Sequence, residues 1–424
     1  MSETPILDLE QEPPKPRRPW VAWFVGGPIT LAFLYAPGIS GAISPHAPAF
    51  NLWLWLPALY VAVTIHELGH CVAAKLAGMD SGGLILGGFS LIKSGQRWVF
   101  RFDGRFLFGG GFIPLPAKGA SDRTHFAWMV AGGPIATLLY LGLCGLAVAR
   151  LGNGTWNWIG AAFWGATLPL SSLLPYTSGG LTSDAANLWR LLRNPEQSRR
   201  WIALVALQTE DANGVLPRDW DSELIEIALH ATDAEVEYPW IKLLAYYRSA
   251  DQRDQETAAR HLEGVLASAS RNGGKALCRV CFLGAVGPSA RRKGAAHARV
   301  WLDRAIKIDK GQKIESTDAA EAAIAMAEQR YDDALRHWAA ARDFLARKRL
   351  DSGIARSAKQ RYAEAESECH AALAELAAAL PVHQAGSPAT KEPAPFPWIG
   401  IAAIAIVGMI LLIALAVRYF PSQN

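Results

Sequence analysis

The chain contains, within one apolar run, the stretch Ala62-Val63-Thr64-Ile65-His66-Glu67-Leu68-Gly69-His70-Cys71-Val72. The run as a whole, Leu52–Ala77, is long enough to cross a bilayer and therefore predicts a membrane-spanning helix. An ionisable side chain deep in a bilayer costs about 2.5–3.5 kcal/mol on insertion scales. Three such side chains within five residues therefore need a role that compensates for this cost.

The spacing of the two histidines in H-E-x-x-H predicts a metal site. On a helix, His66 and His70 lie on one face about 6 Å apart, because residues i and i+4 are neighbours there. This separation suits two imidazole ligands of a tetrahedral Zn²⁺ ion. Glu67 lies beside them, where it can take a proton from a water molecule at the metal. The alternatives are a polar patch between helices or a haem or proton-relay pair, and these leave Glu67 without a role.

A catalytic zinc site needs a third protein ligand, and the sequence offers several. The next two apolar stretches contain no acid or histidine, so the candidates lie in loops: Asp80, Asp103, Asp122, His125 and Asp184. Asp184 follows a helix-breaking run that begins near Pro175, at the membrane side where the histidines are expected. Irregular backbone at membrane depth lines a protein or water cavity. Alternatively, Ser183 and Asp184 only cap the following helix, and spacing alone leaves both interpretations open.

Apolar stretches of membrane-spanning length occur five times: Trp20–Pro37, Leu52–Ala77, Phe126–Ala149, Trp158–Tyr176 and Phe396–Val417. The first follows a polar tail, residues 1–19, and ends without a clear cleavage site, so we interpret it as a retained anchor. Lys and Arg gather before it and between residues 77 and 125. This pattern predicts a cytosolic N-terminus. We expect a bacterial cytoplasmic membrane as the location and the lipid bilayer as a partner.

Together these residues resemble the site-2 protease family of intramembrane metalloproteases. That family carries H-E-x-x-H on one membrane helix and an Asp motif after a Leu-Pro on a later one. Leu174-Pro175 followed by Ser183-Asp184 is similar to this second motif. The resemblance, which covers about residues 20–190, implies that Asp184 joins His66 and His70 around one Zn²⁺ per chain. It also implies a transmembrane protein as the substrate.

The sequence departs from the family pattern near the site. Ala185 stands where the family usually has Gly, and Ser172 and Thr137 stand where it often has Asn. Those Asn positions are expected to orient the substrate backbone or the oxyanion, so the resemblance implies substrate binding by Ser172 and Thr137 with a shorter reach. Ala131-Gly132-Gly133-Pro134 looks like the family's Gly-Pro segment, where small residues allow close helix packing.

Residues 83–114 predict a membrane-associated β-hairpin, which family proteins also carry. Asp103-Gly104 is a two-residue turn signal between Gln96–Phe102 and Arg105–Phe108. A helical substrate must unwind before hydrolysis, and a sheet edge can hold the unwound strand by β-addition. The alternative is a hairpin that only plugs the cavity.

The polar block 185–381 predicts a cytosolic all-α domain. Small residues at Ala258, Ala298, Ala334 and Ala365 recur at intervals near the tetratricopeptide period of about 34 residues. Such arrays form concave peptide-binding surfaces, which favours a cytosolic protein or peptide as a partner. The alternative is a plain helical domain without a groove. Residues 382–395 read as a linker to the C-terminal transmembrane anchor, 396–417.

The fold class we expect is therefore a polytopic α-helical membrane protein with a catalytic core at 20–184. A net charge of +4 from 42 basic and 38 acidic side chains does not suggest nucleic-acid binding. The predicted function is an intramembrane zinc metalloprotease of regulated proteolysis. The alternative is a catalytically degenerate membrane scaffold whose helical domain recruits partners. A transporter would be expected to show an internal inverted repeat, which the sequence lacks.

Overall fold

The computed structural model describes most of the chain between residues 52 and 379: 52–102, 110–116, 122–151, 162, 165–178, 181–232, 235, 237–272, 274–287, 294–309, 316–348 and 350–379. The predicted first span, the linker, the C-terminal anchor and the Asp103-Gly104 turn lie outside these residues. The chain divides into two units, Met1–Glu375 and Leu376–Asn424. The sheet and the helices up to residue 375 belong to the first unit.

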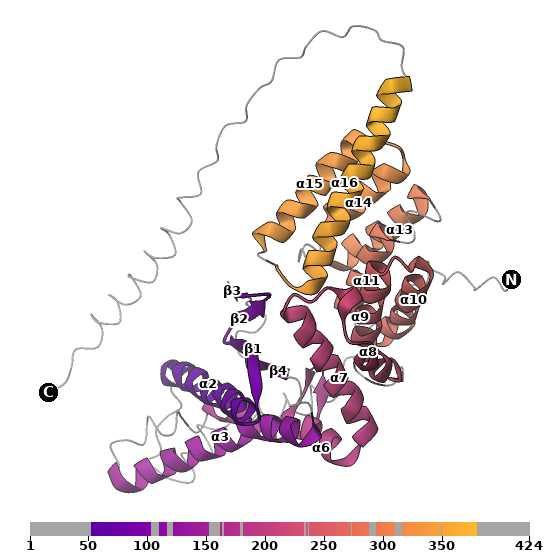
Figure 1. The fold of residues 1–424 in the computed structure, drawn as a ribbon. Coiled ribbons are helices and arrows are strands. Elements are labelled where there is room, and N and C mark those ends of the chain that lie inside the picture. Colours follow the sequence, from indigo (N-terminus) through magenta and orange to yellow (C-terminus); the bar gives the residue numbers. More distant parts are fainter. Residues whose placement is uncertain are drawn as a thin grey trace, which may run out of the picture. The chain divides into compact units, whose positions relative to one another are not determined.

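Two of the described helices are long and apolar enough to cross a membrane, over Leu56–Leu76 and Arg123–Ala147. They belong to α2 (Leu52–Leu76) and α3 (Arg123–Leu151), which cross in Figure 1. A Cβ atom at Gly69 or at Gly132 would overlap the backbone of the other helix. The two helices therefore touch backbone to backbone, as the small residues of the Gly-Pro segment predict.

The segment between these helices forms a four-stranded antiparallel sheet. Its strands are β1 (Met79–Leu86), β2 (Phe89–Ser94), β3 (Arg97–Phe102) and β4 (Gly110–Pro116), in the order β3-β2-β1-β4. The predicted single hairpin is thus too small. Gly87, Gly88 and Gly95 have positive φ angles and make the turns that separate β1, β2 and β3. Glycine adopts this conformation without steric cost.

A short irregular region leads from the membrane helices to the helical region. It comprises α5 (Thr167–Ser171), the two-residue strands β5 (Thr177–Ser178) and β6 (Leu181–Thr182), and α6 (Asp184–Arg193). Of the predicted span Trp158–Tyr176, the structure describes Ala162 and the residues from 165 onward. A small core joins α6 to α2, α3 and the next helix, with members that include Ala74, Phe126, Leu191 and Ile202.

The remaining described elements are helical and share one core. They are α7 (Pro195–Ala212), η3 (Pro217–Asp219), α8 (Ser222–Leu229), α9 (Tyr238–Asp251), α10 (Gln255–Asn272), α11 (Gly274–Val286), α13 (Ala295–Asp309), α14 (Thr317–Ala327), α15 (Tyr331–Arg347) and α16 (Gly353–Ala379). Helices pack in consecutive pairs, α9 with α10, α11 with α13, and α14 with α15. The recurring alanines are all buried. Their assignment to a tetratricopeptide-like array stays a prediction.

Candidate metal centre

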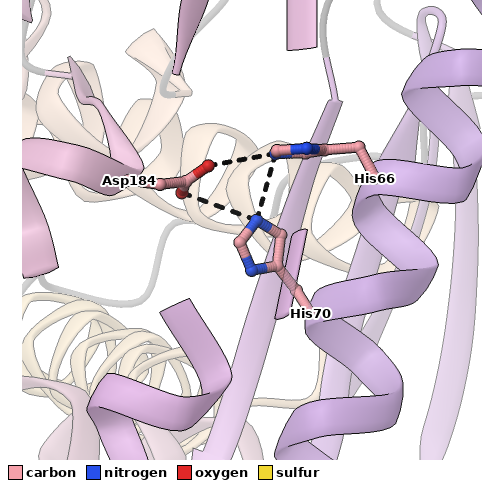
Figure 2. Close-up of side chains that lie close together, drawn as sticks. All are labelled: His66, His70 and Asp184. Atoms are coloured by element: carbon pink, nitrogen blue, oxygen red, sulfur yellow. Dashed lines mark hydrogen bonds and ion pairs between the residues drawn. The ribbon is translucent and has the colours of Figure 1, made fainter. Parts of the chain in front are cut away.

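The structure brings His66, His70 and Asp184 together, as Figure 2 shows. The two Nε2 atoms lie 3.2 Å apart on one face of α2. Oδ2 of Asp184 lies 3.0 Å from Nε2 of His66, and Oδ1 lies 3.5 Å from Nε2 of His70. All three ligand atoms lie within 4.8 Å of one another, and both imidazoles are buried. A single small ion placed between them would touch all three.

The hydrogen bonds on the far side of each ring determine where its proton lies. Nδ1 of His70 lies 2.9 Å from the carbonyl oxygen of Met129, which can only accept. Nδ1 of His66 lies 2.9 Å from the Thr137 hydroxyl, which itself donates to the carbonyl oxygen of Gly133. Both Nδ1 atoms therefore carry the proton. In the neutral imidazole, each Nε2 then carries a lone pair that faces Asp184.

This arrangement fits a divalent metal ion. Two imidazole lone pairs and a carboxylate that converge in a buried space repel one another unless a cation lies between them. Two nitrogens and one carboxylate oxygen form a donor set that Zn²⁺ uses in catalytic sites, where a fourth position stays open. Met129 and Thr137 accept from the two Nδ1 atoms and so hold both rings in the orientation that metal binding requires.

Glu67 lies next to the metal ligands and has a free oxygen. Its side chain is buried, and Oε2 has no hydrogen-bond partner among the described residues. A buried carboxylate oxygen needs a partner, and a water molecule at the metal would supply one. The start of β4 lies directly against this side chain, because a Cβ on Gly110 would lie 2.5 Å from Oε1 of Glu67.

Two glycines make room for the site, and sequence reasoning missed their roles. A Cβ on Gly133 would overlap Nε2 of His70, and one on Gly110 would crowd Glu67. Both lie in visible glycine runs, Gly132-Gly133 and Gly109-Gly110-Gly111. These runs signal close approach of the backbone, but they do not say which side chain approaches.

Asp184 is positioned by the cap of its own helix. The Ser183 hydroxyl accepts hydrogen bonds from the backbone amides of Ala186 and Tyr176 and donates to the carbonyl oxygen of Leu174. Ser183 is thus the N-cap of α6, and the next residue reaches the histidines. Capping and ligand placement are therefore compatible. Among the other candidates, Asp80 pairs with Lys75 and Asp122 pairs with His125, while Asp103 lies outside the described residues.

The two residues expected to bind substrate lie in different surroundings. The Ser172 hydroxyl is buried and has no hydrogen-bond partner among the described residues, while the Ser172 carbonyl accepts from the amide of Ala185. Thr137 is 1% exposed and lies behind His66, with its hydroxyl bonded on both sides. A role in substrate binding stays a prediction for both.

A buried His-His-Asp cluster with an adjacent carboxylate defines a zinc metallopeptidase site. The chain belongs to peptidase family M50, the site-2 protease family of intramembrane metalloproteases, whose family model matches residues 55–384. The match extends well beyond residue 190, where the recognised motifs end. The family implies Zn²⁺ as the cofactor and membrane proteins as substrates. Comparison with curated proteins and with solved structures gives no match.

Proposed function

We propose that this chain hydrolyses peptide bonds of transmembrane proteins in regulated proteolysis, with Glu67 as the catalytic residue and His66, His70 and Asp184 as zinc ligands. The observation that carries the proposal is the convergence of both Nε2 atoms on the Asp184 carboxylate, with each Nδ1 hydrogen-bonded on the far side of its ring. Each ring donates its Nδ1 proton away from the cluster, and in the neutral form that metal binding requires, this leaves two lone pairs facing one carboxylate. A polar patch built for stability alone would pair these groups through a proton.

The chemistry follows from the placement of Glu67. When bound, Zn²⁺ supplies a Lewis acid that activates water and polarises a carbonyl group. Glu67 accepts the proton of the attacking water through its unpartnered oxygen and later delivers it to the leaving amine. Its burial beside Gly110 fixes the carboxylate and excludes bulk water from it.

We infer that the unwound substrate adds as a strand beside β4. Among the described residues, β4 pairs with β1 alone, and its first residue lies against Glu67. The opposite outer strand, β3, lies against the helical region, where Arg101 donates to the carbonyl oxygen of Lys348. An edge strand presents unpaired backbone groups to an extended peptide. The plugging alternative predicts no dependence of cleavage on this edge.

Ser172 and Thr137 take different roles in this proposal. The unpartnered Ser172 hydroxyl is free to donate to the substrate backbone. The Thr137 hydroxyl already accepts from His66 and donates to Gly133. We therefore assign Thr137 to the orientation of His66 in place of the substrate contact expected from the family pattern.

The surroundings support a membrane location at the cytosolic side. One face of β2 and β3 exposes the aromatic side chains Phe89, Trp98, Phe100 and Phe102. An exposed apolar face of this kind is typical of a surface that contacts a membrane or another protein, and Trp98 is a residue type enriched at the membrane interface. Gly95, at the turn between β2 and β3, donates from its backbone amide to the carbonyl oxygen of Ala212 in the helical region. We place the helical region in the cytosol. There, an array of helix pairs would present a surface for a protein or peptide.

Glu67→Gln is the experiment that tests the proposal. We expect the purified variant to retain one zinc per chain and to lose cleavage of a model transmembrane substrate. Undiminished cleavage would exclude Glu67 as the base. A wild-type protein without stoichiometric zinc or cleavage would instead favour the degenerate scaffold.

A further inference from the structure

The helix that carries Asp184 is anchored at its other end by a buried ion pair. Arg190 on α6 pairs with Glu237, just before α9, and both side chains are largely buried. Arg190 also donates to Oδ1 of Asn187, at 2.8 Å, and its guanidinium carbon lies 4.4 Å from the centre of the Trp201 ring. These three contacts fix the position of the guanidinium group.

Asp184 is the member of the candidate metal cluster that does not come from α2. His66 and His70 lie on one helix, which touches α3 backbone to backbone and is bonded to it through Thr137 and Met129. Asp184 comes from a separate helix. Its distance from the two rings therefore depends on what holds α6.

α6 is short enough to transmit a displacement from one end to the other. It has 10 residues, and Arg190 lies about 9 Å along the axis from Asp184 at 1.5 Å per residue. The hydroxyl of Ser183 fixes the first turn, whereas Arg190 fixes the last turn to the helical region. Metal ligands must be placed to within about 0.2 Å, so both attachments matter.

We propose that Arg190, through its pair with Glu237, is a positioning residue for Asp184, so that the helical region completes the metal site. This inference rests on the proposed zinc site. Glu237 lies in the same turn as Glu235, between α8 and α9. A partner that moves this turn would change the affinity for zinc without touching the metal. The helical region thereby acts as a regulator of the peptidase.

A second buried ion pair supplies a matched control. Arg200 donates to Glu235 in the same turn, with Nη2 at 2.8 Å from Oε1, and both side chains are also largely buried. Arg200 lies on α7, however, and not on the helix of Asp184. Loss of either pair leaves a buried carboxylate without its partner, and loss of stability is therefore common to both.

The experiment compares Arg190→Met with Arg200→Met in the full-length chain. Zinc affinity is measured by competition with a chelator, and thermal unfolding is measured without metal. We expect both variants to unfold at lower temperature, and Arg190→Met alone to bind zinc about 10–100-fold more weakly. Equal zinc affinity in Arg190→Met and wild type, or equal weakening in both variants, would overturn the inference.

Glu237→Gln keeps the test decisive if Arg190→Met does not fold. Gln has the shape of Glu without its charge, so zinc affinity should fall in the same direction while the fold persists. Unchanged affinity in this variant contradicts the inference. Failure of the proposed function is distinguishable, because the wild-type protein itself would then bind no stoichiometric zinc.

Discussion

The Thr137 hydroxyl lies 2.9 Å from Nδ1 of His66, on the far side of the ring from Asp184. Because the same hydroxyl donates to the carbonyl oxygen of Gly133, it can only accept from the ring. This contact, between residues 71 positions apart, sets the tautomer of a metal ligand. The buried Thr137 hydroxyl on α3 therefore orients His66.

Thr137→Val should therefore weaken zinc binding. Valine matches the shape of threonine but leaves the Nδ1 proton of His66 without an acceptor in a buried site. Loss of such an outer partner typically costs about 10–100-fold in metal affinity. Thr137→Ser keeps the hydroxyl and should restore most of it. Chelator competition on both variants checks the expectation, and equal affinity in the two would contradict it.

Gly133→Ala should displace His70. The new methyl group would overlap Nε2 of that ring, so the ring must move away from the metal. We expect the zinc content of the purified protein to fall below one per chain. Gly142→Ala is the control on the same helix, because a Cβ there meets nothing within 4 Å. A full zinc complement in Gly133→Ala would show that the site adapts.

Gly110→Ala should lower cleavage while it leaves zinc in place. Its Cβ would lie 2.5 Å from Oε1 of Glu67, which is not a proposed ligand. Displacing a general base can forfeit much of its typical contribution of about 10²–10⁴-fold to the rate, and we expect a loss of at least about 10-fold in kcat. The neighbouring Gly111→Ala is the control, since its Cβ would lie 3.8 Å from Ile85 in ordinary contact. Equal rates in both variants would separate β4 from catalysis.

Asp211 lies on α7, outside the membrane helices, and predicts that the stability of the fold depends on pH. Burial raises the pKa of Asp211 to about 6, although the backbone amide of Ile354 donates to it at 2.7 Å. The folded state thus binds the proton more tightly than the unfolded state, whose pKa is near 3.8. Stability should therefore fall as pH rises from about 4 to about 6. At 1.36 kcal/mol per pKa unit, the loss is on the order of 2–3 kcal/mol.

Asp211→Asn should remove this decline. The amide oxygen of Asn still accepts from Ile354, and no charge forms at neutral pH. We expect a higher unfolding temperature than wild type at pH 7.5 and a similar one at pH 4. Melting curves at both pH values measure the difference. The same decline with pH in variant and wild type would assign it to other groups.

The local part of the site could be predicted from sequence, and the tertiary part could not. Helical spacing alone places His66 and His70 on one face. It left Asp184 undecided between cap and ligand, because the distance from a later helix depends on packing. The same limit applies to Thr137, whose neighbour is far away along the chain. The sheet has more strands than the predicted hairpin because the glycines at 87, 88 and 95 adopt positive φ angles and make further turns, whereas the sequence signal used for the turn was Asp103-Gly104.

The backbone contact between Gly69 and Gly132 has a consequence for how a substrate arrives. Helices that meet without intervening side chains cannot part without losing that contact, so α2 and α3 form one fixed wall beside Glu67. We therefore expect a transmembrane segment to approach from the side on which β4 and the turn before α6 lie. Neither element takes part in the contact between Gly69 and Gly132, so we expect these elements, and not α2 or α3, to move when a substrate enters.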